Sequence, residues 1–103
     1  MILATTEHIS GQELEVLGLV KGSTIQTVNA IRDIGAGLKT LVGGDLTKYN
    51  EMMNNARALA TKRMVEEAQA LGADAVVGIR YSSASVMQNA AEVMAYGTTV
   101  KFR

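Results

Sequence analysis

The chain has 103 residues, of which 48% are hydrophobic and 19% are charged, and it contains neither proline nor cysteine. This composition predicts one compact domain, residues 1–103, and excludes disulfides, thiolate nucleophiles and cysteine-based metal sites. Ten basic and ten acidic residues give a formal net charge of zero, which argues against nucleic acid or a membrane surface as a partner. No run approaches the ~20 apolar residues of a membrane span, so we expect a soluble, cytoplasmic protein.

The beginning of the chain predicts extended structure. Residues 1–6 (MILATT) form a short extended segment, and residues 7–12 read as a turn. Residues 13–28 (ELEVLGLVKGSTIQTV) are rich in valine, leucine, isoleucine and threonine and include Gly18 and Gly22. Because glycines inside a strand often mark bulges, we expect a long strand that bends, or two strands separated by a bulge.

Two helices are predicted next. Apolar residues at three- and four-residue steps within residues 31–42 favour a short amphipathic helix, which the glycine pair 43–44 ends. A longer helix begins at Asp45 or Thr47, either of which can cap it, and runs to Leu71. Its predicted apolar stripe comprises Tyr49, Met52, Met53, Ala56, Leu59, Ala60, Met64, Ala68 and Leu71.

Two strands close the chain after Gly72, a residue suited to the left-handed end of a helix. The first strand, residues 73–83 (ADAVVGIRYSS), is predicted to place on one face Ala75, Val77, Ile79 and Tyr81, and on the other Val76, Gly78 and Arg80. Residues 85–91 (SVMQNAA) form a loop or hairpin connection. The last strand, residues 92–102 (EVMAYGTTVKF), is predicted to share one face among Met94, Tyr96, Thr98, Val100 and Phe102.

Two of the predicted strands are apolar on both faces. The runs VLGLV (16–20) and AVVGI (75–79) do not alternate cleanly between apolar and polar residues. One layer of helices covers only one face of a small sheet, so the second face is expected to pack on another subunit. The sequence therefore predicts an α+β homo-oligomer.

Four segments, taken in order, resemble the YbjQ-like family over nearly the whole chain: GLVKG (18–22), IRDIGAGLKTLVGG (31–44) leading into Tyr49, LGADAVVGI (71–79) and YGTTVKF (96–102). The resemblance implies a dodecin-like subunit, in which a small antiparallel sheet packs against one long and one short helix. It also implies assembly into a ring-shaped homopentamer. The family is uncharacterised and carries the label "putative heavy-metal-binding".

The single histidine, His8, lies beside Glu7 and near Glu13 in the stretch TTEHISGQE. One chain supplies too few ligands there for a metal site, so no metal is expected unless rotational symmetry brings copies of His8 together. An acid/base role lacks a neighbouring nucleophile. The alternative is a polar turn, and we expect neither a cofactor nor an enzyme activity.

Four residues are candidates for ligand binding: Arg32, Asp33, Tyr49 and Arg80. Arg32 and Asp33 match a pair that the resembled family carries, with a structural role at an interface as the alternative. Tyr49 is otherwise a packed aromatic whose hydroxyl needs a partner. Arg80 stands on an apolar strand, so it reaches solvent at an edge, pairs across an interface, or forms an anion-binding ring in the assembly.

These observations predict a small cytoplasmic homo-oligomer that binds a small ligand or ion between its subunits. The alternative is a structural or partner-binding scaffold that has no ligand.

Overall fold

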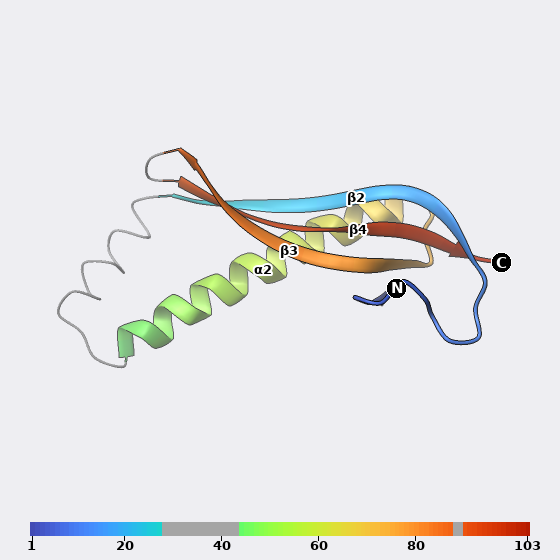
Figure 1. Cartoon of the computed structure of the whole chain (residues 1–103). Coiled ribbons are helices and arrows are strands. Elements are labelled where there is room, and N and C mark those ends of the chain that lie inside the picture. Colours follow the sequence, from blue (N-terminus) through green and yellow to red (C-terminus); the bar gives the residue numbers. More distant parts are fainter. Residues whose placement is uncertain (28–43, 88–89) are drawn as a thin grey trace.

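A computed structural model describes residues 1–27, 44–87 and 90–103. Its elements are β1 (Ile2–Leu3), β2 (Leu14–Thr27), α2 (Gly44–Ala70), β3 (Ala75–Met87) and β4 (Ala90–Phe102). The strands form one sheet in the order β1-β3-β4-β2, and α2 runs across one of its faces (Figure 1). The α+β class is therefore confirmed, and the short helix predicted over residues 31–42 lies outside the described residues.

The sheet is mixed, whereas a wholly antiparallel sheet was expected. β4 pairs antiparallel with both β2 and β3, but β1 pairs parallel with β3, with Ile2 opposite Ala75. The pairing continues past β1, because the Ala4 amide donates to the Val76 carbonyl at 3.0 Å. Two short segments far apart in the sequence make this contact, and no local sequence pattern predicts it.

β2 contains the bulge that its glycines predict. The register against β4 shifts between Val16 and Gly18, and Gly18 adopts a φ of 146°. Beyond the bulge, Val20, Gly22 and Thr24 are buried beneath α2. The prediction of one long, bent strand is thus confirmed, with the bend at the first of its two glycines.

The faces predicted for β3 are wrong beyond Gly78. Gly78 has a φ of 61°, and the register against β4 shifts between Val77 and Arg80. This bulge places Ile79 with Val76 in the core beneath α2, whereas Val77 belongs to a cluster on the opposite face. Strict alternation cannot foresee the extra residue that a bulge inserts into a strand.

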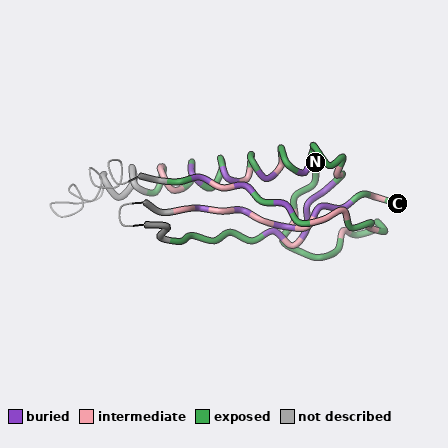
Figure 2. The backbone as a smooth tube through the Cα atoms, turned by 90° about the horizontal axis from the view of Figure 1, so that it is seen from above, coloured by how far each residue is buried: buried purple, intermediate pink, exposed green. Residues whose placement is uncertain are grey.

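α2 buries a narrower stripe than its sequence predicts (Figure 2). The fully buried side chains of this stripe are Ala56, Ala60, Met64 and Ala68. Leu59 and Leu71 were expected to join them but are 40% and 50% exposed. Three of the four buried residues are alanines, so the helix backbone approaches β2 closely at Gly22, where an added Cβ would meet the Ala60 carbonyl oxygen.

The two final strands are longer than predicted. β3 continues to Met87 and β4 begins at Ala90, so most of the connection predicted over residues 85–91 is strand. The ladder between the two strands provides hydrogen-bond partners for this backbone, which lets residues of ordinary strand propensity extend the hairpin.

Candidate binding pocket

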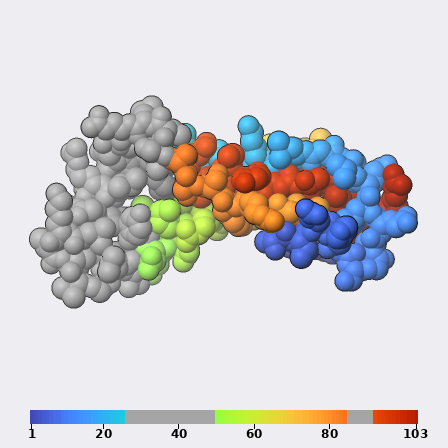
Figure 3. All heavy atoms as spheres, viewed as in Figure 1, coloured from blue at the N-terminus to red at the C-terminus, as the bar shows by residue number. Residues whose placement is uncertain are grey.

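A pocket of about 730 Å³ lies on the sheet face opposite α2. Residues 1–13 lie against the end of the sheet that holds the pocket and form one wall of the pocket (Figure 3). The apolar part of its lining consists of Leu14, Val16, Val77 and Val100. Leu14 and Val16 precede the bulge in β2, and Val77 precedes the bulge in β3. The charged part consists of Glu7, Glu13, Arg80 and Arg103.

The N-terminal wall is held by one apolar anchor and by backbone hydrogen bonds. Ile9 packs against the cluster of Ala75, Val77 and Val100. The Gly78 amide donates to the Thr6 carbonyl at 2.9 Å, so the bulge in β3 fastens the wall. The Thr6 hydroxyl donates to the His8 carbonyl at 2.9 Å. The His8 side chain is exposed along the pocket.

Arg80 stands at one end of the pocket and is exposed. Its Nη1 donates to the Thr5 carbonyl at 2.9 Å and to the Ile79 carbonyl at 2.8 Å. These two bonds orient the guanidinium without neutralising its charge. Its exposure in the single chain is compatible with each alternative that the sequence left open for Arg80: solvent at an edge, a pairing across an interface, and an anion-binding ring.

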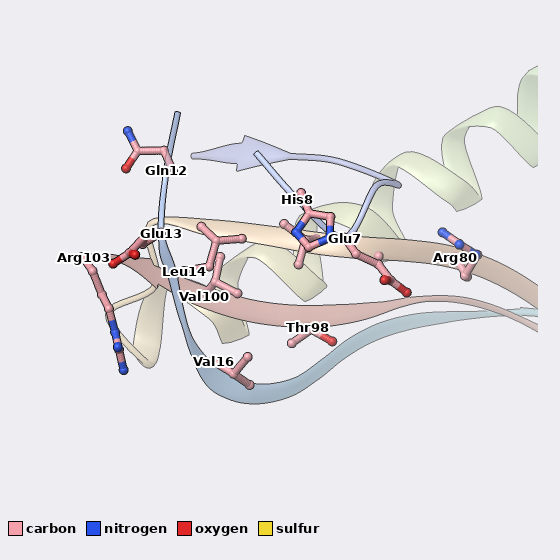
Figure 4. Close-up of a pocket in the computed structure, with 12 residues that line it drawn as sticks. Glu7, His8, Gln12, Glu13, Leu14, Val16, Arg80, Thr98, Val100 and Arg103 are labelled. Atoms are coloured by element: carbon pink, nitrogen blue, oxygen red, sulfur yellow. The ribbon is translucent and has the colours of Figure 1, made fainter. Parts of the chain in front are cut away.

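Arg103 stands at the other end (Figure 4). Its amide donates to the Glu13 carbonyl at 3.0 Å, and its Nη2 lies 3.7 Å from Glu15 Oε1. His8 and Glu7 lie between the two arginines in the same view. The pocket is therefore a charged trough with a valine floor.

The fold brings together two candidates that the sequence treated separately, since His8 and Arg80 line the same pocket. Arg32 and Asp33 lie outside the described residues. For Tyr49 the structure describes only its position in α2.

Several lining residues were missed by reasoning from the sequence, among them Val16, Thr98, Val100 and Arg103. They belong to two segments that meet only in the sheet, β2 and the end of the chain formed by β4 and Arg103. One local signal existed: Gly78 follows a pair of valines, and a glycine inside a strand indicates a bulge beside which a side chain is redirected.

Glu7, His8 and Glu13 do not form a metal site within one chain. In the described part of the molecule, no group of three or more histidine, aspartate or glutamate side chains is placed to hold a metal ion. Zinc and related ions need three or four such ligands at about 2 Å. The residues that the structure describes therefore do not fit a heavy-metal site within one subunit.

In the part of the chain that the structure describes, the fold and the pocket define a small α+β protein with a helix on one face of a mixed four-stranded sheet and an open, charged pocket on the other. Within residues 1–27, 44–87 and 90–103, no helix combines the length and the apolar character needed to span a membrane. The chain belongs to the YbjQ-like family: the family model described as "Putative heavy-metal-binding" matches residues 1–103.

Its relatives are uncharacterised proteins named UPF0145. The chain is 63% identical to the one from Alkaliphilus metalliredigens over 102 residues, covering 99% of each chain. It is 50% identical to the one from Thermotoga maritima over 102 residues, covering 98% of this chain and 96% of the relative. The fold is also similar to the crystal structure of a protein of unknown function of the DUF74 family from Pediococcus pentosaceus. That likeness has a TM-score of 0.70 at 19% identity and covers 100% of this chain and 98% of the other.

Proposed function

We propose that this protein is a small, cytoplasmic, non-enzymatic subunit of a dodecin-like ring, a homopentamer, that binds a small ligand or ion between its subunits. The observation that carries the proposal is the exposure of large apolar side chains on β2, an edge strand. Val16, Leu19 and Ile25 are 68%, 71% and 57% exposed. Their burial by a second copy would contribute about 25 cal/mol for each Å² removed from water.

The edges of the sheet support a ring over a closed pair. β2 forms one edge, and the other edge is β3 beyond Ile79, the last residue of β3 whose amide bonds the N-terminal segment. Unpaired edges favour strand addition. Pairing β2 of one copy with β3 of the next would use both edges of every subunit, and such head-to-tail contacts form a ring when the rotation between neighbouring subunits closes. The number five comes from the family resemblance.

The shape of the chain supports assembly as well. Its principal extents are 55 × 26 × 17 Å and its radius of gyration is 16.7 Å. A compact domain of this length has a radius of gyration of roughly 13 Å. An elongated subunit buries less of its own apolar surface, so association supplies part of the missing core.

The ligand part of the proposal is supported by the location of the pocket. Val16 lies both in the pocket lining and on the edge strand β2, so a neighbouring subunit paired with β2 would stand beside the opening. An ion held by copies of His8 around the ring axis belongs to the same proposal. A net charge of zero supports partners other than nucleic acid or membrane, and we propose no cofactor.

A structural or partner-binding scaffold is the second candidate. The exposed apolar side chains of β2 account for assembly without any ligand. The two candidates predict the same ring and differ only in what the purified ring contains.

Native mass spectrometry of the purified protein, with elemental analysis of the same sample, tests the proposal. We expect a pentamer for the wild type and a monomer for Leu19→Asp, because an exposed side chain that takes a charge weakens only an interface. Asn54→Asp adds the same charge on an exposed position of α2 and should leave the pentamer intact. A monomeric wild type contradicts the assembly. A pentamer that contains no metal and does not bind added zinc, nickel or copper contradicts the proposal that the ring binds a metal ion.

A further inference from the structure

The charged side chains are spread along the length of the pocket. Arg80 and Arg103 lie at its two ends (Figure 4). With Glu7 and Glu13 they give a lining of two positive and two negative charges. Among the described residues the ion pairs are Lys62–Glu66 and Arg103–Glu15, so Arg80 has no carboxylate partner there. A guanidinium that is held in place and not neutralised binds a carboxylate through paired hydrogen bonds.

The floor between the charged groups is apolar. Val77 is 5% exposed and Val100 is 1% exposed, whereas Val16 is 68% exposed. The first two are fixed by packing beneath the N-terminal wall, and the third leaves apolar surface open to a ligand. A volume of about 730 Å³ falls within the usual range for small-molecule sites. Its lining is more polar than apolar, so the charged groups carry most of the recognition and the valines a smaller part.

We propose that this pocket binds a small monocarboxylate with a branched aliphatic body, the carboxylate on the Arg80 guanidinium and the body against the exposed Val16, above the buried Val77 and Val100. The proposal rests on the ligand-binding part of the proposed function, for which it names the class of ligand, and it places that ligand in a pocket lined by one chain with a neighbouring subunit only beside the opening. Glu7 and Glu13 select against multiply charged anions such as phosphate, because like charges in one site repel. Two sources share this chemistry: a free branched-chain acid and the corresponding zwitterionic amino acid, whose ammonium would face the glutamates.

Saturation-transfer NMR titrations with 4-methylpentanoate, leucine and inorganic phosphate test the proposal. We expect at least one of the two carboxylates to bind about tenfold or more tightly than phosphate, because only they offer the valine floor an apolar partner. Tighter binding of leucine identifies the amino acid, and Glu13→Gln should then remove its advantage. Tighter binding of 4-methylpentanoate identifies the free acid.

Two variants address the two halves of the site. Arg80→Gln removes the charge but keeps a donor for the Thr5 carbonyl, and should weaken carboxylate binding about tenfold or more, the usual effect of losing a charge-assisted bond. Val16→Glu places a carboxylate on the exposed floor without touching the core and should abolish binding. Circular dichroism of both variants checks that each is folded.

Leu19→Glu is the matched control, because Leu19 is as exposed as Val16, lies on the same strand and does not line the pocket. All lining residues come from one chain, so this variant should bind the carboxylate with unchanged affinity even where it separates the subunits. Phosphate binding as tightly as the carboxylates, wild-type affinity in both pocket variants, or lost affinity in Leu19→Glu would each overturn the proposal. The proposal would also be overturned if neither carboxylate bound at millimolar concentration.

Native mass spectra of the same samples separate the two proposals. A monomer that binds the carboxylate supports the pocket and contradicts the ring. A pentamer that binds neither carboxylate overturns the pocket ligand and leaves the assembly standing.

Discussion

At the scale of single residues, Gly22 permits the close contact between β2 and α2. A Cβ at this position would meet the Ala60 carbonyl oxygen and the Met64 amide nitrogen of the helix. Backbone atoms cannot rotate away as a side chain can. We therefore expect Gly22→Ala to lower the free energy of unfolding by about 3 kcal/mol or more, at the upper end of the usual penalty for overpacking, as measured by urea titration.

The neighbouring Lys21 provides the control for this substitution. Lys21 is exposed on the same strand, so Lys21→Ala should change the free energy of unfolding by no more than about 0.5 kcal/mol. Equal urea midpoints for Gly22→Ala and Lys21→Ala would show that the helix does not approach β2 as closely as described.

At the scale of elements, α2 ends in a hydrogen-bonded cap that Gly72 makes possible. The Ala73 amide donates to the Ala68 carbonyl at 3.1 Å and the Gly72 amide to the Gln69 carbonyl at 3.0 Å, the two bonds of a Schellman motif. Gly72 has a φ of 75°, with open space around it. Gly72→Ala should therefore lower the unfolding free energy by about 1 kcal/mol through backbone strain alone.

Asparagine distinguishes strain from lost space at this position. It tolerates the left-handed conformation better than alanine does, although it is larger. We expect the thermal unfolding temperature of Gly72→Asn to lie closer to that of the wild type than the unfolding temperature of Gly72→Ala does. The reverse order would indicate that steric contact, and not the backbone conformation, requires glycine.

At the scale of the whole molecule, assembly makes stability depend on concentration. If subunits in the proposed ring unfold only after they separate, mass action raises the unfolding midpoint as protein is added. Differential scanning calorimetry over an about hundredfold range of concentration should show this rise for the wild type and a constant, lower midpoint for Leu19→Asp. A wild-type midpoint that stays constant over that range contradicts the ring.

Much of the fold could be predicted from local sequence. The long helix, the cap at Gly72 and the bend of β2 at Gly18 each follow from residue types whose preferences act over a few neighbours. The faces of β3 could not be predicted, because the bulge at Gly78 depends on how β3 pairs with β4. The parallel pairing of β1 escaped for the same reason, since its partner is remote in the chain.

The pocket shows the same division. His8 and Arg80 were identified by their chemical type, one as the single histidine and the other as a charge on an apolar strand. Their common location was not, because it requires the N-terminal segment to fold back over the sheet and the Gly78 bulge to hold it there. Arg103 and Val100 had no local signal at all.

By itself the sequence determined the α+β class and the presence of an apolar surface larger than one helix can cover, because composition and periodicity depend on each residue and its near neighbours. The family followed from the resemblance of four segments. Only the tertiary structure decided which face of the sheet stays open, on which face the Ile79 side chain lies, and that His8 and Arg80 line one pocket. These depend on pairing between distant segments, and a single inserted residue exchanges the two faces of a strand.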